Sequence, residues 1–221
     1  MSRVAAFWAC LGAFTALTVG LITIPAFGDV DESFTRAHPK SAWAPLVPWV
    51  RGYELFGQRG PTLLVFAPLI GWWAWRRRDR VPVVALVVAE VLLNGGVGVA
   101  KYGLGRVGPF AAGNAHRFFA GGDIYPSGHV SNAVVLYGLL AWLAPPRWRR
   151  RAVVAAVVLS VTVGAGTVFL RTHWLSDVLG GWLAGGLVLL GLPTVLGAVD
   201  GLCRRRDRSC ADAPRIGGAS A

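Results

Sequence analysis

Charged residues are scarce in this sequence: only 15% of its 221 residues are Asp, Glu, Lys or Arg. A soluble domain normally carries about 25% charged residues. Hydrophobic residues make up 54% of the chain, the mean hydropathy is +0.53, and the apolar residues gather in runs near the roughly 20 residues that a membrane-spanning helix needs. The composition therefore argues against an ordinary soluble domain and predicts one integral membrane domain over residues 1–203.

Acidic residues are scarcer than basic ones, 11 against 22 Lys and Arg, which gives a net charge of +11. Three arginine clusters, at residues 76–80, 147–151 and 204–208, each stand directly at the end of an apolar run. This is the positive-inside pattern of short cytoplasmic loops, whereas a nucleic-acid-binding domain would show a basic folded face. We therefore predict a multi-pass plasma-membrane protein that contacts the lipid bilayer and binds no nucleic acid.

Cysteine is also rare, with only Cys10, Cys203 and Cys210. No CxxC pair and no Cys/His spacing typical of a metal site is present. We expect neither a structural disulfide nor a bound metal, and no cofactor.

Six apolar runs organise the chain. We predict spans at about residues 4–27, 61–75, 81–100, 128–143, 152–170 and 176–199. The first run is long for a signal peptide and lacks a small-x-small cleavage site, so we expect it to be retained. The predicted fold class is all-α: an integral membrane bundle of six transmembrane helices.

Two segments lie outside these spans. Residues 28–60 are polar and aromatic, with Trp43, Trp49 and Tyr53, and are broken by proline, so we expect a short segment along the outer interface after the first span. Residues 204–221 form a basic tail that we expect to be disordered and cytoplasmic. Six spans put both termini in the cytoplasm, and the loop 101–127 and the turn 171–176 then face outward, to the periplasm or the cell exterior.

Polar residues are costly near a membrane, and here they concentrate in the outward segments. Three short motifs hold them: Lys101 to Pro109, Tyr125 to His129, and Arg171 to Asp177. His173 and Asp177 are four residues apart and so share a helix face. A carboxylate beside an imidazole fixes its tautomer and leaves the other ring nitrogen free as a base or nucleophile.

The remaining motif residues are suited to holding and cleaving a phosphate. Ser127 stands in N-cap position before an apolar run, so the amide of Gly128 would point at an anion. Lys101 and Arg106 supply positive charge, and His129 can donate a proton near neutral pH. Together they predict a phosphoryl-transfer site, which is metal-independent because no metal-ligand set accompanies it.

These motifs resemble those of the type-2 phosphatidic acid phosphatase family, which is related in fold to the vanadium haloperoxidases. The family motifs are Lys-x6-Arg-Pro, Pro-Ser-Gly-His and Ser-Arg-x5-His-x3-Asp. Here Pro-Ser-Gly-His is intact at 126–129 and His-x3-Asp at 173–177, while Lys101 and Pro109 match the ends of the first motif. Their order and the six-span layout match as well, so the resemblance covers nearly the whole chain.

The resemblance implies an activity and a role for each residue. His173 would be the nucleophile that forms a phosphohistidine, Asp177 its orienting acid, and His129 the acid for the leaving group. The implied reaction is hydrolysis of a lipid phosphate or diphosphate at the outer membrane face. Candidate substrates are phosphatidic acid, phosphatidylglycerol phosphate, and polyprenyl phosphates or diphosphates.

Two motif arginines are absent. Gly108 stands where the first motif has its arginine, and Thr167 stands where the third has its own. We hypothesise that Arg106 and Arg171, both close to the motifs in outer loops, supply the missing charge.

Several alternatives stay open. The same residues would serve a phosphotransferase that passes the phosphoryl group to an acceptor other than water, or a lipid-phosphate-binding relative that lost activity. A small transporter is less favoured because no half-length helices are evident. Glu90 and Asn94, one turn apart in the third span, form either a functional site or a buried hydrogen-bonded pair.

The loop residues His116, Arg117 and Asp123 are further candidates for substrate recognition. The oligomeric state, and the choice of one lipid among the candidates, are not predicted.

Overall fold

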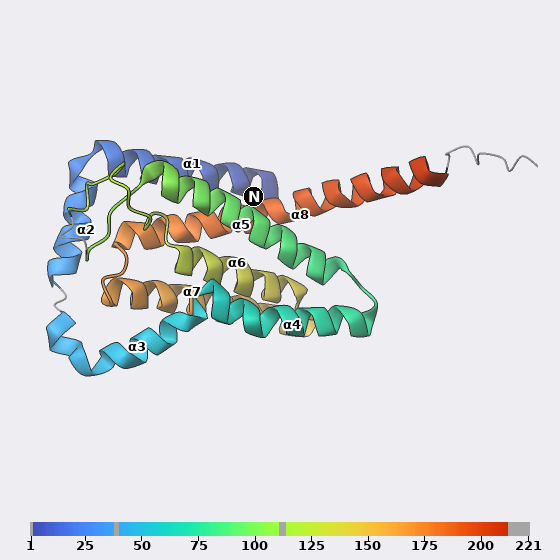
Figure 1. The fold of residues 1–221 in the computed structure, drawn as a ribbon, viewed down its shortest axis with the longest axis horizontal. Helices are drawn as coiled ribbons and strands as arrows, with labels where there is room; N and C mark the ends of the chain where they lie inside the picture. Colours follow the sequence, from blue (N-terminus) through green and yellow to red (C-terminus); the bar gives the residue numbers. More distant parts are fainter. Residues whose placement is uncertain (1, 38–39, 111–113, 212–221) are drawn as a thin grey trace, which may run out of the picture.

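The structure, a computed structural model, describes residues 2–37, 40–110 and 114–211 (Figure 1). In this part of the chain all regular elements are helical, which confirms the all-α class. The α-helices are α1 (Arg3–Thr23), α2 (Pro25–Ala37), α3 (Val47–Tyr53), α4 (Arg59–Arg77), α5 (Val81–Leu104), α6 (Gly128–Leu143), α7 (Pro146–Phe169) and α8 (Leu175–Ala211). Two 3-10 helices, η1 (Lys40–Leu46) and η2 (Glu54–Phe56), flank α3.

Several of these helices are suited to the interior of a bilayer. Helices α1, α5 and α7 and the segment Leu175–Val199 of α8 are long and apolar enough to cross a membrane. The protein is therefore a multi-pass membrane protein. Helices α4 and α6 coincide with the two other predicted spans. Helix α6, with 16 residues, is shorter than the four helices named above. The count of six spans stays a prediction.

The first predicted span is shorter than expected because a proline interrupts it. Helix α1 ends at Thr23, Ile24 is extended with φ −116° and ψ 107°, and Pro25 starts α2. The residue before a proline is sterically disfavoured in helical conformation, which explains the break. In the expected interfacial segment the described residues form mostly helices, namely α2, η1, α3 and η2.

The tail also differs from the expectation. Helix α8 continues to Ala211, so the part of the predicted disordered tail up to that residue is helical. Residues 212–221 lie outside the described part of the chain.

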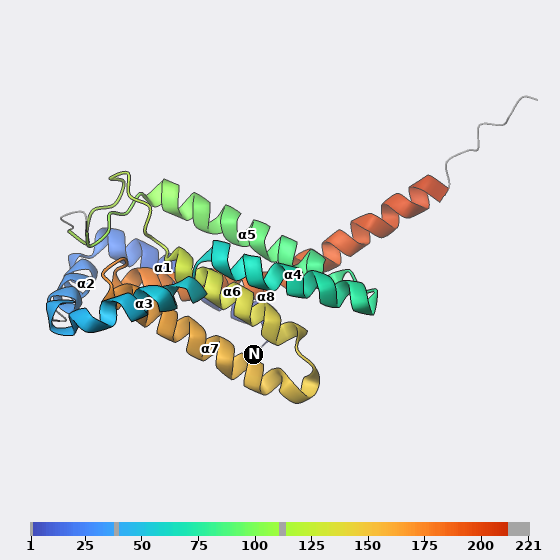
Figure 2. The ribbon, with the colours of Figure 1, turned by 60° about the horizontal axis from the view of Figure 1, so that its bottom comes forward.

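Helix α6 lies at the centre of the bundle and packs against α5, α7 and α8 (Figures 1 and 2). Buried residues occur around its whole circumference rather than on one stripe: Val130, Ser131, Asn132, Ala133, Val135, Leu136, Tyr137, Leu139 and Ala141. A helix that is apolar on all sides can be surrounded by other helices as well as by lipid. The central position of α6 agrees with this pattern.

Glycines on α8 allow it to approach α6 closely. A Cβ atom at Gly181 would lie 2.9 Å from the carbonyl oxygen of Ser127, and one at Gly185 would lie 2.7 Å from Cβ of Val134. Small residues at a helix interface let backbones come together in membranes. The contact brings the start of α8, with Asp177, against the turn that precedes α6.

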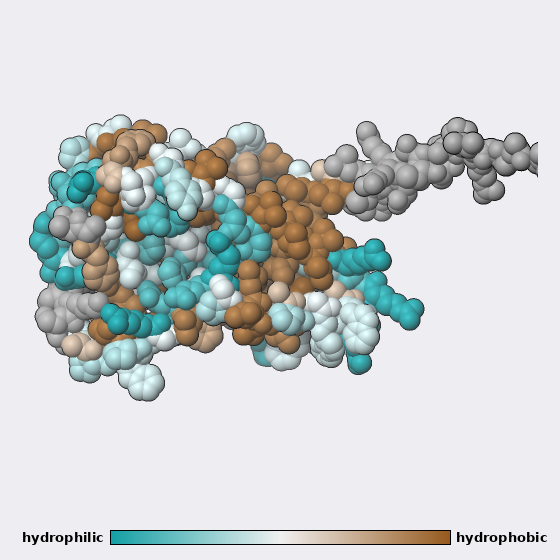
Figure 3. Space-filling model, viewed as in Figure 1, coloured by the Kyte–Doolittle hydropathy of each residue, from teal (hydrophilic) through white to brown (hydrophobic). Residues whose placement is uncertain are grey.

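The surface matches a membrane-embedded bundle. Figure 3 shows an apolar band over the middle of the molecule, between a polar end that carries α2 and polar side chains at the α4–α5 connection. The start of α1 and the end of α8 both lie toward the end opposite α2 (Figure 1). The outer loops and the arginine-rich connections thus occupy opposite ends of the bundle.

Candidate active site

A cavity of about 380 Å³ lies where the N-terminal ends of α4 and α6 meet the C-terminal part of α5. Four of its lining side chains are basic: Arg59, Lys101, His129 and His173. The others are Gly57, Gln58, Asp123, Ile124 and Gly128. The cavity is lined by residues of all three predicted motifs and of the segment 28–60, for which no catalytic or binding role was predicted.

The two histidines face each other across this cavity. His129 is the second residue of α6, and His173 lies in the turn between α7 and α8. Their ring centroids are 6.0 Å apart, with the ring planes inclined by 71°. Both imidazoles are therefore close enough to reach one phosphoryl group.

Asp177 lies behind His173, in the first turn of α8. Its Oδ2 is 3.5 Å from Nδ1 of His173 and accepts a hydrogen bond from the amide of Trp174 at 2.8 Å. In the described part of the chain Nδ1 makes no hydrogen bond, so the pair is in electrostatic contact only. Catalytic hydrogen bonds are often long without substrate and shorten when it binds. The arrangement leaves Nε2 on the opposite edge of the His173 ring.

Lys101 brings its ammonium group to the start of α6. Its Nζ donates to the backbone carbonyl of Asp123, and a Cβ added at Gly128 would lie 3.9 Å from Nζ. The missing side chain at Gly128 thus keeps open the space between the ammonium and the N-terminus of α6. A helix N-terminus and a cation together attract an anion.

Ser127 does not line the cavity, although it was expected to bind phosphate. It is fully buried, and its hydroxyl accepts the amide of Val130 at 3.5 Å as the N-cap of α6. Its own amide donates to the carbonyl of Asp177 at 2.9 Å. Ser127 therefore caps α6 and links its start to α8.

Arg106 does not reach the cavity either, and this corrects the expectation that it supplies phosphate-binding charge. Its side chain is fully buried. Its amino groups donate to Asp31 at 2.7 Å, to Asp177 at 2.5 Å and to Ser176 at 2.7 Å, while Nε donates to the carbonyl of Ala115 at 3.1 Å. NH2 also donates to the Ala115 carbonyl at 2.9 Å, so all five N–H donors are engaged by the protein and none is left for a substrate phosphate.

The Arg106 cluster instead holds Asp177 in place from behind. Asp31 of α2 bridges Arg106 and Ser176, accepting from the Ser176 amide at 2.9 Å and from its hydroxyl. Two carboxylates and one guanidinium are thus buried together and hydrogen-bonded, the condition under which buried charge is tolerated.

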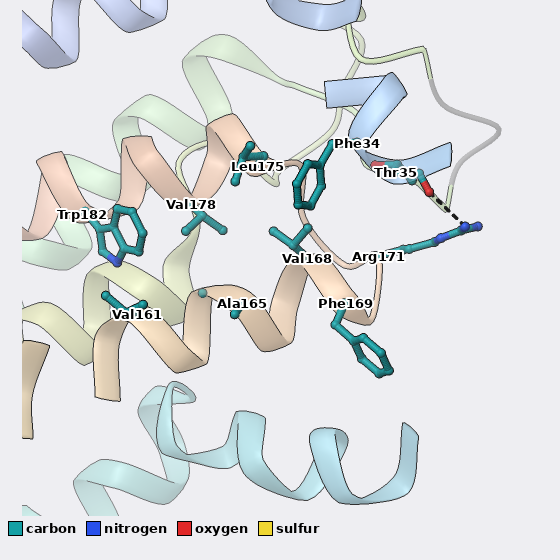
Figure 4. Close-up of a pocket in the computed structure, with 11 residues that line it drawn as sticks. Phe34, Thr35, Val161, Ala165, Val168, Phe169, Arg171, Leu175, Val178 and Trp182 are labelled. Carbon is teal, nitrogen blue, oxygen red and sulfur yellow. Dashed lines mark hydrogen bonds between the residues drawn. The ribbon is translucent and has the colours of Figure 1, made fainter. Parts of the chain in front are cut away.

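Arg171 lies at a different cavity, which corrects the second part of the same expectation. That cavity, of about 310 Å³, is lined mostly by apolar side chains of α7 and α8 and by Phe34 and Thr35 of α2. Figure 4 shows the Arg171 side chain at its edge, with NH2 donating to the Thr35 carbonyl at 3.0 Å. Arg171 has φ +59°, a left-handed conformation that lets the chain turn tightly between α7 and α8.

The sequence profile of the PAP2 superfamily matches residues 82–199, just over half of the chain. The chain belongs to this superfamily. The predicted membership of the type-2 phosphatidic acid phosphatase family is therefore confirmed. Membership supports a phosphatase that acts on lipid phosphates in general.

The fold agrees with a solved structure. A transmembrane PAP2-type phosphatidylglycerolphosphate phosphatase from Bacillus subtilis superposes with a TM-score of 0.71 over 87% of this chain and 96% of that chain, at 23% identity. This likeness shows a shared fold. No curated protein sequence is significantly similar to the chain.

Gly108 and Thr167 stand where the family motifs have arginines, and neither brings charge to the cavity of this PAP2 protein. A Cβ at Gly108 would lie 3.2 Å from Cγ2 of Ile124. Thr167 is fully buried, with its hydroxyl donating to the Gly164 carbonyl at 2.8 Å. Both positions therefore hold uncharged residues that pack closely against their neighbours.

Arg59 is the cavity residue that sequence reasoning missed. It is the first residue of α4 and lies outside the segment matched by the PAP2 profile. Its Nε is 3.6 Å from Oε2 of Glu90 on α5, and Asn94 donates to the same Glu90 oxygen at 3.3 Å. Glu90 and Asn94 are therefore hydrogen-bonded to each other, although Asn94 is exposed rather than buried, and Arg59 is an added partner of Glu90. A charged residue just before an apolar run, with an acid in the next run, was the available signal.

Of the three further candidates in the outer loop, only Asp123 lines the cavity of the PAP2 fold. His116 lies 3.2 Å from Asp29 of α2, and Arg117 is exposed.

Tyr125, just before α6, is buried and its hydroxyl lies 2.8 Å from that of Thr18. Burial raises the pKa of Tyr125 to about 12, so this phenol is neutral and supports the turn rather than exchanging protons.

Proposed function

We propose that this protein hydrolyses a lipid phosphate or diphosphate through a phosphohistidine on His173, without a metal. The observation that carries the proposal is the convergence of His129, His173 and Lys101 on one cavity, with Asp177 behind His173. A phosphoryl transition state is stabilised chiefly by positioning and positive charge. In the described part of the chain no three His, Cys, Asp or Glu residues lie together as a metal site would need.

Each group has a defined step in this reaction. Nε2 of His173 attacks the terminal phosphorus, and the bond from phosphorus to the lipid-side oxygen breaks. His129 gives its proton to that departing oxygen. Water then attacks the phosphohistidine, His129 takes a proton from the water, and the phosphorus–nitrogen bond breaks to release inorganic phosphate. Asp177 stabilises the charge that develops on the His173 ring.

The proposed location of this chemistry is the outer face of the plasma membrane, with both termini in the cytoplasm. The arginine-rich α4–α5 and α6–α7 connections lie at the end of the bundle opposite α2 (Figure 1). Such connections stay cytoplasmic by the positive-inside rule, which supports an outward cavity. A cysteine introduced at Arg117 in a cysteine-free chain should react with a membrane-impermeant thiol reagent in whole cells. Labelling only after lysis would reverse the proposed orientation.

The activity is tested by phosphate release from a panel of lipid phosphates. Purified wild type should release phosphate from at least one of phosphatidic acid, phosphatidylglycerol phosphate or a polyprenyl phosphate or diphosphate. His173→Ala should reduce release to the background rate, and His129→Ala should slow it by about 10²–10⁴-fold. His116→Ala is the matched control, because His116 lies outside the cavity, and it should keep wild-type release.

Trapping identifies the intermediate and separates the rival functions. An acid-labile phosphoryl label should appear on wild type and be absent from His173→Ala. Equal release by His173→Ala and wild type would refute the proposal. Phosphoryl transfer to an added alcohol in place of phosphate release would indicate a phosphotransferase, and substrate binding without any release would indicate a non-catalytic relative.

A further inference from the structure

The cavity contains a second cation in addition to Lys101. Arg59 and Lys101 come from α4 and α5 and line the same cavity as the two histidines. Lys101 is fixed by the backbone carbonyl of Asp123 on the loop side of the cavity. Arg59 reaches the cavity from the start of α4, next to the lining residues Gly57 and Gln58.

Arg59 is free to bind a ligand in a way that Arg106 is not. Its side chain is 43% exposed, and its closest carboxylate contact is the 3.6 Å approach of Nε to Glu90. Among the described residues the carboxylate contact of Arg59 is made by Nε, which leaves the donors of the two terminal amino groups available to a phosphate. An arginine fork matches a pair of phosphate oxygens in geometry, and such charge-assisted bonds are strong.

Glu90 has the features of a positioning group for Arg59. Its side chain is only 14% exposed although it lies on a helix that crosses the membrane. Asn94 fixes one carboxylate oxygen at 3.3 Å, while Oε1 has no hydrogen-bond partner within the described residues. A single loose carboxylate contact orients the guanidinium without occupying its fork.

The ends of two helices add to the positive field of the cavity. Helix α4 begins at Arg59, after an N-cap Gln58 whose side chain makes no capping bond, and α6 begins at Gly128. Residues from both N-termini line the cavity. Together with the side chains of Arg59 and Lys101, these termini favour a multiply charged anion.

We propose that Arg59 binds the substrate phosphate together with Lys101 and that Glu90 positions Arg59, so that the charge absent at positions 108 and 167 is supplied from α4. This inference rests on the proposed phosphatase function and adds a specificity-determining residue to it. The competing interpretation is that Arg59 and Glu90 form only a structural ion pair between α4 and α5.

Steady-state kinetics on the full-length purified protein separates the two interpretations. Arg59→Ala should raise KM for the lipid phosphate by about tenfold or more with kcat nearly unchanged, since the lost contact binds substrate and transition state alike. The inhibition constant of inorganic phosphate should rise in parallel. Arg59→Lys, which keeps the charge but not the fork, should raise KM less.

Two further variants complete the design. Arg51→Ala, an exposed arginine of α3 outside the cavity, is the matched control and should keep wild-type KM and kcat. Glu90→Gln should raise KM by a few-fold with kcat unchanged, because the guanidinium keeps its charge and loses its orientation. A purely structural ion pair would instead lower thermal stability in Arg59→Ala and Glu90→Gln alike while leaving KM unchanged.

A binding measurement separates failure of this inference from failure of the proposed function. In a His173→Ala background, inorganic phosphate should raise the melting temperature, and adding Arg59→Ala should abolish most of that shift. If His173→Ala abolishes turnover while Arg59→Ala keeps the wild-type KM and phosphate inhibition, only the role of Arg59 is refuted. If wild type neither releases phosphate nor is stabilised by it, the phosphatase function itself is refuted.

Discussion

Two arginines of this protein, Arg106 and Arg59, differ in what their guanidinium groups already contact. Arg106 is fully buried and bound to Asp31, Asp177 and Ser176. Arg59 is 43% exposed, with one carboxylate at 3.6 Å. Arg106 lies inside a family motif and Arg59 lies outside the segment that the family profile matches. Nearness to a motif in sequence therefore says less about substrate contact than the partners that the fold provides.

The same contrast describes two layers of the site. The layer behind His173 is buried, and in it one guanidinium, that of Arg106, binds the carboxylates of both Asp31 and Asp177 and so fixes Asp177. The layer in front is open and positively charged. A rigid support behind an open cavity is the arrangement expected of a preorganised site, where groups are fixed before the charge of the reaction develops.

Removing Arg106 should have the largest effect of the changes that test this comparison. Arg106→Met leaves Asp31 and Asp177 buried without a counter-charge, which should cost about 3–5 kcal/mol of stability. Thermal unfolding in detergent should show a large fall in melting temperature, with activity lost as Asp177 moves. Arg59→Ala is the informative partner, because its exposed side chain should leave the melting temperature almost unchanged. An equal loss of stability in both variants would remove the distinction between the two arginines.

Neutralising Asp31 should have a smaller effect. Asp31→Asn removes one carboxylate from the cluster but leaves Asp177 to pair with Arg106, so we expect a loss of about 1.5–3 kcal/mol. A double-mutant cycle with Arg106→Met should give a coupling energy of about 1–3 kcal/mol, measured by unfolding in denaturant. The matched cycle of Asp31→Asn with Arg59→Ala should be additive, and coupling there would contradict the separation of the two layers.

The sequence predicted best those features that depend on neighbours within a turn. The start of α6 follows from an N-cap serine before an apolar run, and the structure begins that helix at Gly128 as expected. The proximity of His173 and Asp177 follows from their spacing of four residues. The positions of the apolar helices follow from hydropathy alone, although Pro25 shortens the first.

Features set by distant contacts could not be predicted in this way. Arg106 was expected in the cavity because it lies near Lys101, yet its partners Asp31 and Asp177 are 75 and 71 residues away in sequence. The fold of the loop after α5, which turns the Arg106 side chain inward, has no local signature. Arg59 carries a local signal, a charge just before an apolar run, but its place at the cavity depends on how α4 enters the bundle beside α6 (Figure 2).

Changes at Arg171 should have the smallest effect, because its guanidinium lies at the apolar cavity and not at the histidines. Arg171→Ala should keep the KM for lipid phosphate at the wild-type value while losing about 1–2 kcal/mol of stability with the bond to the Thr35 carbonyl. The stability loss in Arg171→Gly should be about 1 kcal/mol smaller than in Arg171→Ala, because glycine adopts φ +59° without strain. Kinetics and thermal unfolding of the two variants test both statements. A rise in KM in both, with stability unchanged, would restore Arg171 as a phosphate-binding residue and would place the missing charge in the turn between α7 and α8 rather than on α4.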